Sequence, residues 1–469
     1  MSEFVRYVLY ELKNCLVLVL LAGVLAAAVL AIAFFVHKKK YKGQRKFPWG
    51  KVFLWLAFIG YLAMVLYVTT FRTSLGHRSF NLHLFRAWRE AWNAYSQHRW
   101  LNVLLNIAMF GPLGFLLPLL NKKFRKWYLT ISAGFGISLA IELFQLAFGR
   151  GVCDVDDLFC NTFGAVIGYV VIMTILSMVG EKGKRLKPSL AFGCLTLASV
   201  MAVCSIFIVY ECKEYGNLPI APAYTADLSH LKWNLNCELP SMETEIAVYK
   251  TQSRSIEECD AFGKEFEKIV GAEYTTISYY QEAAYYMDQS GDENGTHFLF
   301  VSYLDPSYEY HCDYGDNPVW GEGSREVIEA ALSKFPVFIP EYAEFTVDGL
   351  GWHSFVVDKR IDGSVMIDGI LRCRYEEDGT IRDIEYDLLS YTYHDKVNII
   401  SAEDAYQKLR EGKSGDIAFF ESLNSTEVTV LSCKVGYEVD TKGFYQPVYI
   451  FEVLIPETGT LYTVIPAMK

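Results

Sequence analysis

The stretch from Arg150 to Gly168, RGVCDVDDLFCNTFGAVIG, joins an acidic segment directly to the start of an apolar run. At about 100° per residue, five of its side chains fall within a helical arc of about 80°. These five are Asp154, Asp157, Asn161, Gly164 and Gly168. By the same rule Asp156 points about 120° away from this face. Two glycines four residues apart let a neighbouring helix approach closely, so we expect a membrane helix with a polar end and a packing face.

The composition predicts a protein that is partly embedded in a membrane. Of its 469 residues, 52% are hydrophobic and 21% are charged, which is less charge than an ordinary soluble protein carries. This apolar composition excludes a disordered chain, a protein that coats nucleic acid and a small disulfide scaffold. A spanning helix needs about 20 apolar residues, and six stretches qualify or nearly qualify: 15–36, 52–71, 101–120, 127–148, 159–179 and 189–210.

Charge divides the chain into two parts. Residues 1–210 hold 23 Lys and Arg against 8 Asp and Glu, whereas residues 211–469 hold 20 against 46. A basic, apolar part followed by an acidic, polar part predicts membrane helices followed by a soluble domain. The expected domains are a first span with its basic loop (1–51), a four-helix membrane domain (52–179), a sixth span (180–212) and an α+β domain (213–469), with two structural units split near residue 318.

Basic loops predict the orientation of the chain in the cell membrane. The segments 37–51, 121–126 and 180–188 are rich in Lys and Arg and alternate with the other loops, so we expect them on the cytoplasmic side. The N-terminus and the C-terminal domain would then lie outside. The outer segment 72–100 contains Trp88, Trp92 and Trp100, which favours an amphipathic helix in the interface.

The predicted topology brings costly polar side chains to one depth near the outer surface. They come from the second to fifth spans and the loops between them: Arg72, Asn106, Glu142, Gln145, Arg150, Asp154, Asp157 and Asn161. A charged residue in the middle of a bilayer costs about 2.5–3.5 kcal/mol on insertion scales, so the set needs ion partners, a water-filled cavity or a function. Arg72 and Arg150 are the expected counter-ions. The alternative is that these residues form ion pairs that only fix helix packing.

Four separated motifs resemble the VanZ-like family across about residues 52–179. Three runs carry most of the likeness: NIAMFGPLGFLLP from Asn106, IELFQ from Ile141, and the stretch from Arg150 to Gly168. Arg72 and NLHLF from Asn81 look like that family's first-span terminus and following loop. The resemblance implies a bacterial membrane protein, mostly from Gram-positives, of a family associated with tolerance of the glycopeptide teicoplanin. It implies that seven of these polar residues, all except Arg72, matter to the family, but it names no reaction. The extra spans at 15–36 and 189–210 and the large C-terminal domain depart from the family's minimal form.

The C-terminal part reads as an α+β domain. We expect helices at 256–270, 323–335 and 402–412, with Ser255 and Ser401 as N-caps of the first and last. Alternating runs predict strands near 275–280, 297–303, 364–375, 427–438 and 448–454. AEDAYQKL from Ala402 and KGFYQPVYIFEV from Lys442 faintly resemble PepSY-like or YycI-like outer domains.

Metal and cofactor signals are missing from the sequence. The histidines and cysteines lack the spacing of a zinc site, and no hydrolase, metalloprotease or nucleotide-binding motif occurs. We therefore expect no metal and no cofactor. Six cysteines would lie outside, and their pairing is open: Cys212, Cys237, Cys259, Cys312, Cys373 and Cys433.

Three functions remain open. The first is a cell-envelope protein whose polar cluster engages an anionic lipid-linked or cell-wall precursor group at the outer leaflet, or shields that group from a glycopeptide. Arg72 and Arg150 would meet its phosphate. The second is an intramembrane enzyme acting on a lipid-linked phosphate, with Asp154 and Asp157 binding a divalent cation and Glu142 as general base. The third is a sensor or scaffold that works through its outer domain, with the helices as an anchor. Membrane lipids are partners in each case, and nucleic acid in none.

Overall fold

A computed structural model describes most of the chain. The described residues are 30–32, 34–40, 47–70, 78–149, 151–179, 186–240, 245–280, 283–288, 295–313, 319–424, 427–456 and 458–469. The chain divides into two compact units. The first comprises Met1–Ala91 and Gln97–Cys212, and the second comprises Trp92–Ser96 and Lys213–Lys469.

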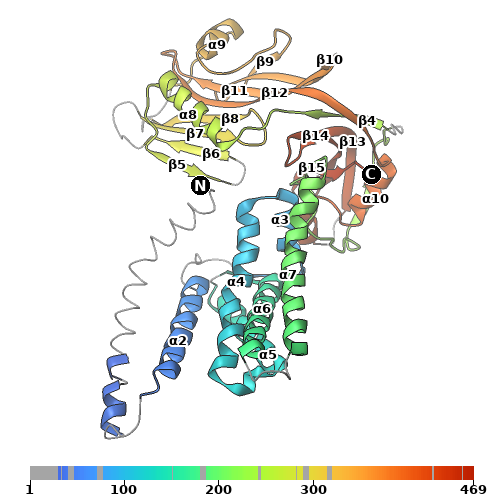
Figure 1. The fold of residues 1–469 in the computed structure, drawn as a ribbon. Helices are drawn as coiled ribbons and strands as arrows, with labels where there is room; N and C mark the ends of the chain where they lie inside the picture. The colour runs from blue at the N-terminus through green and yellow to red at the C-terminus, as the bar shows by residue number, and fades with distance from the viewer. Residues whose placement is uncertain are drawn as a thin grey trace. The chain divides into compact units, whose positions relative to one another are not determined.

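Among the described residues, five helices of the first unit are long and apolar enough to cross a membrane. They are α2 (Trp49–Thr70), α4 (Gln97–Leu120), α5 (Trp127–Phe148), α6 (Val155–Val179) and α7 (Leu186–Cys212), shown in Figure 1. These helices coincide with five of the six predicted spans. Most of the other predicted span, 15–36, lies outside the described residues.

Short elements connect the helices of the first unit. They are β1 (Arg78–Asn81), α3 (Arg86–Ala94), the 3₁₀ helix η1 (Lys122–Arg125) and β2 (Gly151–Asp154). The two strands pair in parallel, with Asn81 opposite Asp154. The helix predicted within 72–100 is therefore present as α3, although Trp100 belongs to α4. Its depth in a membrane stays a prediction.

Two kinds of packing hold the first unit together. Tyr61 and Val65 of α2, Phe110 and Leu113 of α4 and Ile141 of α5 form one buried apolar cluster. In contrast, α4 and α6 meet through glycines. A Cβ atom on Gly164 would lie 1.9 Å from the backbone oxygen of Ile107, and one on Gly168 would lie 1.9 Å from that of Gly111. The two backbones are thus in direct contact, as the small-residue motif allows.

Over the residues that the structure describes, the second unit is built on one sheet of 13 strands. The main path runs β3 (Lys232–Leu235), β13 (Glu427–Val439), β14 (Phe444–Ile455), β4 (Glu245–Lys250), β12 (Ile381–Asn398), β8 (Tyr308–Asp313), β7 (Thr296–Ser302), β6 (Ala283–Met287) and β5 (Thr276–Tyr279). Off this path, β11 (Val365–Tyr375) pairs with β12, β10 (Trp352–Asp362) with β11, β9 (Glu344–Val347) with β10, and β15 (Gly459–Pro466) with β14. The long strand β12 has 18 residues and pairs with β11 over residues 381–392, with β8 over residues 383–386 and with β4 over residues 392–398.

Helices form two apolar cores with this sheet. Phe266 of α8 (Ile256–Val270) and Leu332 of α9 (Arg325–Leu332) belong to one core. Leu409 of α10 (Ala402–Arg410) and Phe420 of α11 (Ile417–Ser422) belong to the other. The predicted α+β layout, its three helices and its strands are confirmed. The helix α11 was not predicted, because its six residues cover less than two turns.

Both predicted N-caps, Ser255 and Ser401, are confirmed. A mutation can test the contribution of the first. The Ser255 hydroxyl accepts a hydrogen bond from Glu258 N, and the Glu258 carboxylate accepts one from Ser255 N, which makes a capping box. We expect Ser255→Ala to lower the stability of the first turn of α8 by about 1 kcal/mol. Amide exchange in that turn should then be about fivefold faster. Hydrogen exchange of the full-length protein in detergent measures this.

Ser324→Ala is the matched control for that experiment. Ser324 occupies the N-cap position of α9, but its side chain makes no capping hydrogen bond. Exchange in the first turn of α9 should therefore change little. Equal acceleration at both helices would contradict the assigned cap.

Candidate functional site

The close contact of α4 with α6 places two polar side chains against each other. Asn106 precedes Ile107, on whose backbone Gly164 packs, and Asp157 lies two turns before Gly164 on α6. The amide Nδ2 of Asn106 donates to Oδ1 of Asp157 at 2.5 Å. Two residues 51 positions apart thus form one pair, and the pair depends on the glycine contact for its spacing.

A cavity of about 130 Å³ opens beside this pair. Residues of α3, α4 and α6 line it: Ala87, Glu90, Arg99, Asn102, Val103, Asn106, Asp156, Asp157 and Cys160. Three of them are acidic and one is basic. The basic residue is already engaged, because Arg99 Nη1 lies 3.1 Å from Oε2 of Glu90. Arg86 Nε holds the other oxygen of Glu90 at 2.8 Å.

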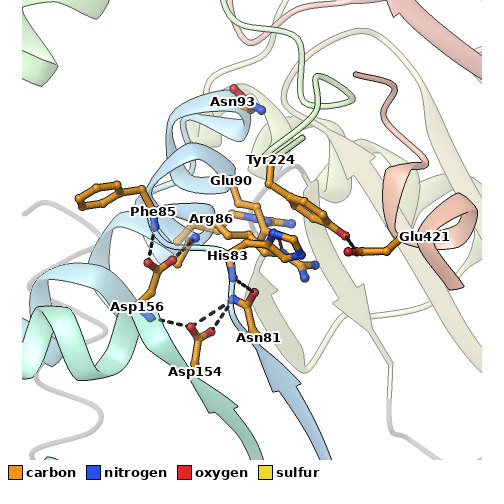
Figure 2. A network of polar contacts seen from close by, with 12 residues as sticks. Asn81, His83, Phe85, Arg86, Glu90, Asn93, Asp154, Asp156, Tyr224 and Glu421 are labelled. Carbon is orange, nitrogen blue, oxygen red and sulfur yellow. Dashed lines mark hydrogen bonds and ion pairs between the residues drawn. The ribbon is translucent and has the colours of Figure 1, made fainter. Parts of the chain in front are cut away.

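Asp156 holds the start of α3. Its carboxylate accepts hydrogen bonds from Phe85 N at 2.5 Å and from Ala87 N at 2.7 Å, and the residue is 0% exposed. The first turn of a helix has unpaired N–H groups and a partial positive charge, which a carboxylate stabilises. Because position 85 is Phe, which cannot accept these bonds through its side chain, the capping group comes from α6 (Figure 2).

The carboxylate of Asp154, next to Asp156, also accepts several hydrogen bonds. Asn81 Nδ2 lies 3.1 Å from both of its oxygens, and Asp156 N donates to Oδ1 at 2.8 Å, as Figure 2 shows. The parallel pairing of β1 with β2 puts Asn81 directly opposite Asp154. Burial raises the pKa of Asp154 above its ordinary value, and the hydrogen bond from Asn81 only partly offsets this.

Glu142 joins the same network from α5. It is 3% exposed, and its Oε2 accepts a hydrogen bond from Asp154 N at 3.0 Å. The sequence predicted an ion pair with Arg150, and both Arg150 and Arg72 lie outside the described residues. Glu142 of α5 thus lies in a buried position beside Asp154 of β2.

Gln145 and Asn161 belong to other contacts. Gln145 Nε2 donates to Thr69 O at the end of α2, at 2.7 Å. Asn161 is 2% exposed, and its Nδ2 donates to Ser138 Oγ on α5 at 3.0 Å. Within the described residues, Asn161 Oδ1 has no hydrogen-bond partner. Neither residue lines the cavity, so these two amides tie α2, α5 and α6 together beside it.

Five polar or reactive residues that line the cavity were not among the predicted site residues: Glu90, Arg99, Asn102, Asp156 and Cys160. Asp156 was set aside because it points away from the Asp154–Gly168 face, yet that direction leads to α3. The signal that was available is the polar spacing of α3, where Arg86 and Glu90 form an i,i+4 ion pair. Among the described residues, no three or more His, Cys, Asp or Glu side chains form a group that could hold a metal ion.

Comparison with known proteins finds a family match that falls mainly within the first unit. Residues 52–177 match the family model described as VanZ/LLP1, which confirms the predicted resemblance. No curated protein matches the chain. Among solved structures, the Bacillus megaterium YpeB C-terminal domain matches with 12% sequence identity and a TM-score of 0.20, over 46% of this chain and 95% of that one.

Proposed function

We propose, from the VanZ/LLP1 match over residues 52–177, that this chain is a VanZ-like integral membrane protein of the bacterial cell envelope. Its membrane domain engages a lipid-linked or cell-wall precursor group at the outer leaflet and thereby affects tolerance of glycopeptides such as teicoplanin. The acidic C-terminal domain then lies outside the cell, as the alternation of basic loops predicts.

One observation carries this proposal. The Asn106–Asp157 pair faces a cavity at the ends of α4 and α6, and the network of Asp154, Asp156 and Glu142 lies beside it. Polar groups in a membrane domain are costly and commonly mark functional sites. A set that only fixed helix packing would not need to border an open cavity.

Teicoplanin tolerance of cells that carry Asp157→Asn tests the proposal. Asparagine keeps the shape of the side chain but removes the negative charge, so we expect tolerance to fall to that of cells lacking the protein. Glu142→Gln should act in the same direction, because Glu142 supports the backbone of Asp154. Immunoblots of the membrane fraction and melting temperatures in detergent show whether each variant is still folded.

Asp358→Asn provides the matched control, because Asp358 is an exposed acid in the second unit. It should leave tolerance unchanged. Unchanged tolerance in Asp157→Asn and Glu142→Gln, at normal membrane levels, would refute the proposal. If removal of the C-terminal domain then abolished tolerance, the helices would serve as an anchor for a sensor or scaffold.

A further inference from the structure

We propose that the cavity takes a primary ammonium group, carried by the headgroup of a lipid, with Asp157 as its main acceptor. This inference rests on the proposed function, since it names the chemistry of the group that the membrane domain engages.

The polar groups of the cavity have unused capacity to accept hydrogen bonds. Oδ1 of Asp157 accepts from Asn106, while Oδ2 accepts no hydrogen bond from any residue that the structure describes. Because that amide donates through Nδ2, the Oδ1 of Asn106 is left to accept. Asn102, which is exposed, adds another amide oxygen to the lining. The cavity therefore offers several acceptors, and an ammonium group supplies three donors.

The charge of the lining selects against an anion. Glu90, Asp156 and Asp157 contribute three carboxylates, and Arg99 contributes one guanidinium, which Glu90 already holds. Asp154 adds a further carboxylate next to Asp156. Unit charges of the same sign repel strongly where water is sparse, so a phosphate at Asp157 is disfavoured and a cation is favoured.

The other carboxylates are less available to a ligand than Asp157. Both oxygens of Asp156 accept hydrogen bonds, from Phe85 N and Ala87 N. Asp154 accepts hydrogen bonds from the amide of Asn81. Glu90 is shared between Arg86 and Arg99. Asp157 thus keeps the accessible acceptor, and a charge-assisted hydrogen bond from N⁺–H to this carboxylate is about twice as strong as a neutral one.

Position favours a lipid as the source of the ammonium. Asp157 lies in the first turn of α6, and Asn102 lies in the second turn of α4. Both turns are at helix ends, where spanning helices meet lipid headgroups. A soluble amine carries the same chemistry, so the experiment distinguishes the two sources.

Native mass spectrometry of the full-length protein, released from nanodiscs of defined composition, tests the inference. The probes are phosphatidylethanolamine, which carries a primary ammonium, phosphatidylcholine, whose ammonium has no N–H, and phosphatidylglycerol, which has no amine. We expect retention of phosphatidylethanolamine over the other two by about tenfold. Asp157→Asn should abolish this preference, whereas Asp358→Asn should keep it.

Each outcome of this experiment is decisive. If soluble ethanolamine protects the protein against heat, in an Asp157-dependent way, and no phosphatidylethanolamine is retained, the ammonium is confirmed and the lipid source is wrong. Equal retention of all three lipids, or a preference that Asp157→Asn leaves intact, would overturn the inference. Loss of teicoplanin tolerance without ammonium selectivity would refute the ligand alone, and selectivity without any effect on tolerance would refute the proposed function alone.

Discussion

Gly164→Ala is expected to destabilise the membrane domain by about 3 kcal/mol or more, because the added methyl group has no room. Its Cβ would lie 1.9 Å from the backbone oxygen of Ile107 and 2.9 Å from that residue's carbonyl carbon. A backbone cannot rotate away as a side chain can, so α4 and α6 must separate. Separation would also break the hydrogen bond between Asn106 and Asp157. Thermal unfolding of the full-length protein in detergent measures the loss.

Gly136→Ala is the control for this prediction. Gly136 lies in α5, and no atom is found within 4 Å of a Cβ built there. Alanine is a better helix former than glycine, so this variant should be as stable as the parent or slightly more stable. The packing model fails if both variants melt at the same temperature. Gly168→Ala should behave like Gly164→Ala, since its Cβ would lie 1.9 Å from Gly111 O.

Asp156→Ala is expected to release the start of α3. The substitution leaves the N–H groups of Phe85 and Ala87 without their acceptor in a buried place, at a cost of about 2–5 kcal/mol. Amide exchange in Arg86–Ala94 should therefore accelerate at least tenfold, as measured by hydrogen exchange and mass spectrometry of the full-length protein.

Asp156→Asn separates the two contributions of this carboxylate. The amide keeps one oxygen as acceptor and loses the negative charge that complements the helix dipole. Its effect on exchange in α3 should lie between those of the parent and Asp156→Ala. Unchanged exchange in Asp156→Ala would show that α3 does not depend on α6.

The helices of the membrane domain could be predicted from the sequence because their length and apolarity are local properties. The predicted span 127–148 coincides with α5, which begins after Lys126 and ends at Gly149, where a left-handed residue caps the helix. The pairing of β1 with β2 could not be predicted. Each strand has four residues, and the pairing joins segments more than 70 positions apart.

Part of the candidate site could also be predicted, where its residues lie on one helix. The helical arc correctly grouped Asp157 with Gly164, because one helix fixes their relative directions. It could not show which neighbour meets the opposite side of α6, where α3 brings Glu90 to the cavity beside Asp156. Gln145 was grouped with the others by depth alone, and its contact with Thr69 depends on how α5 packs against α2.

The exchange of Asn106 and Asp157 tests the central claim that distant polar residues form one site. Asp157→Asn and Asn106→Asp each disturb the pair, the first by removing its charge and the second by placing two carboxylates at hydrogen-bond distance. The double variant restores one amide and one carboxylate with their positions exchanged. We predict that its melting temperature in detergent recovers most of the loss seen in Asn106→Asp. A double variant that melts below both single variants would contradict the convergence of α4 and α6 at this cavity.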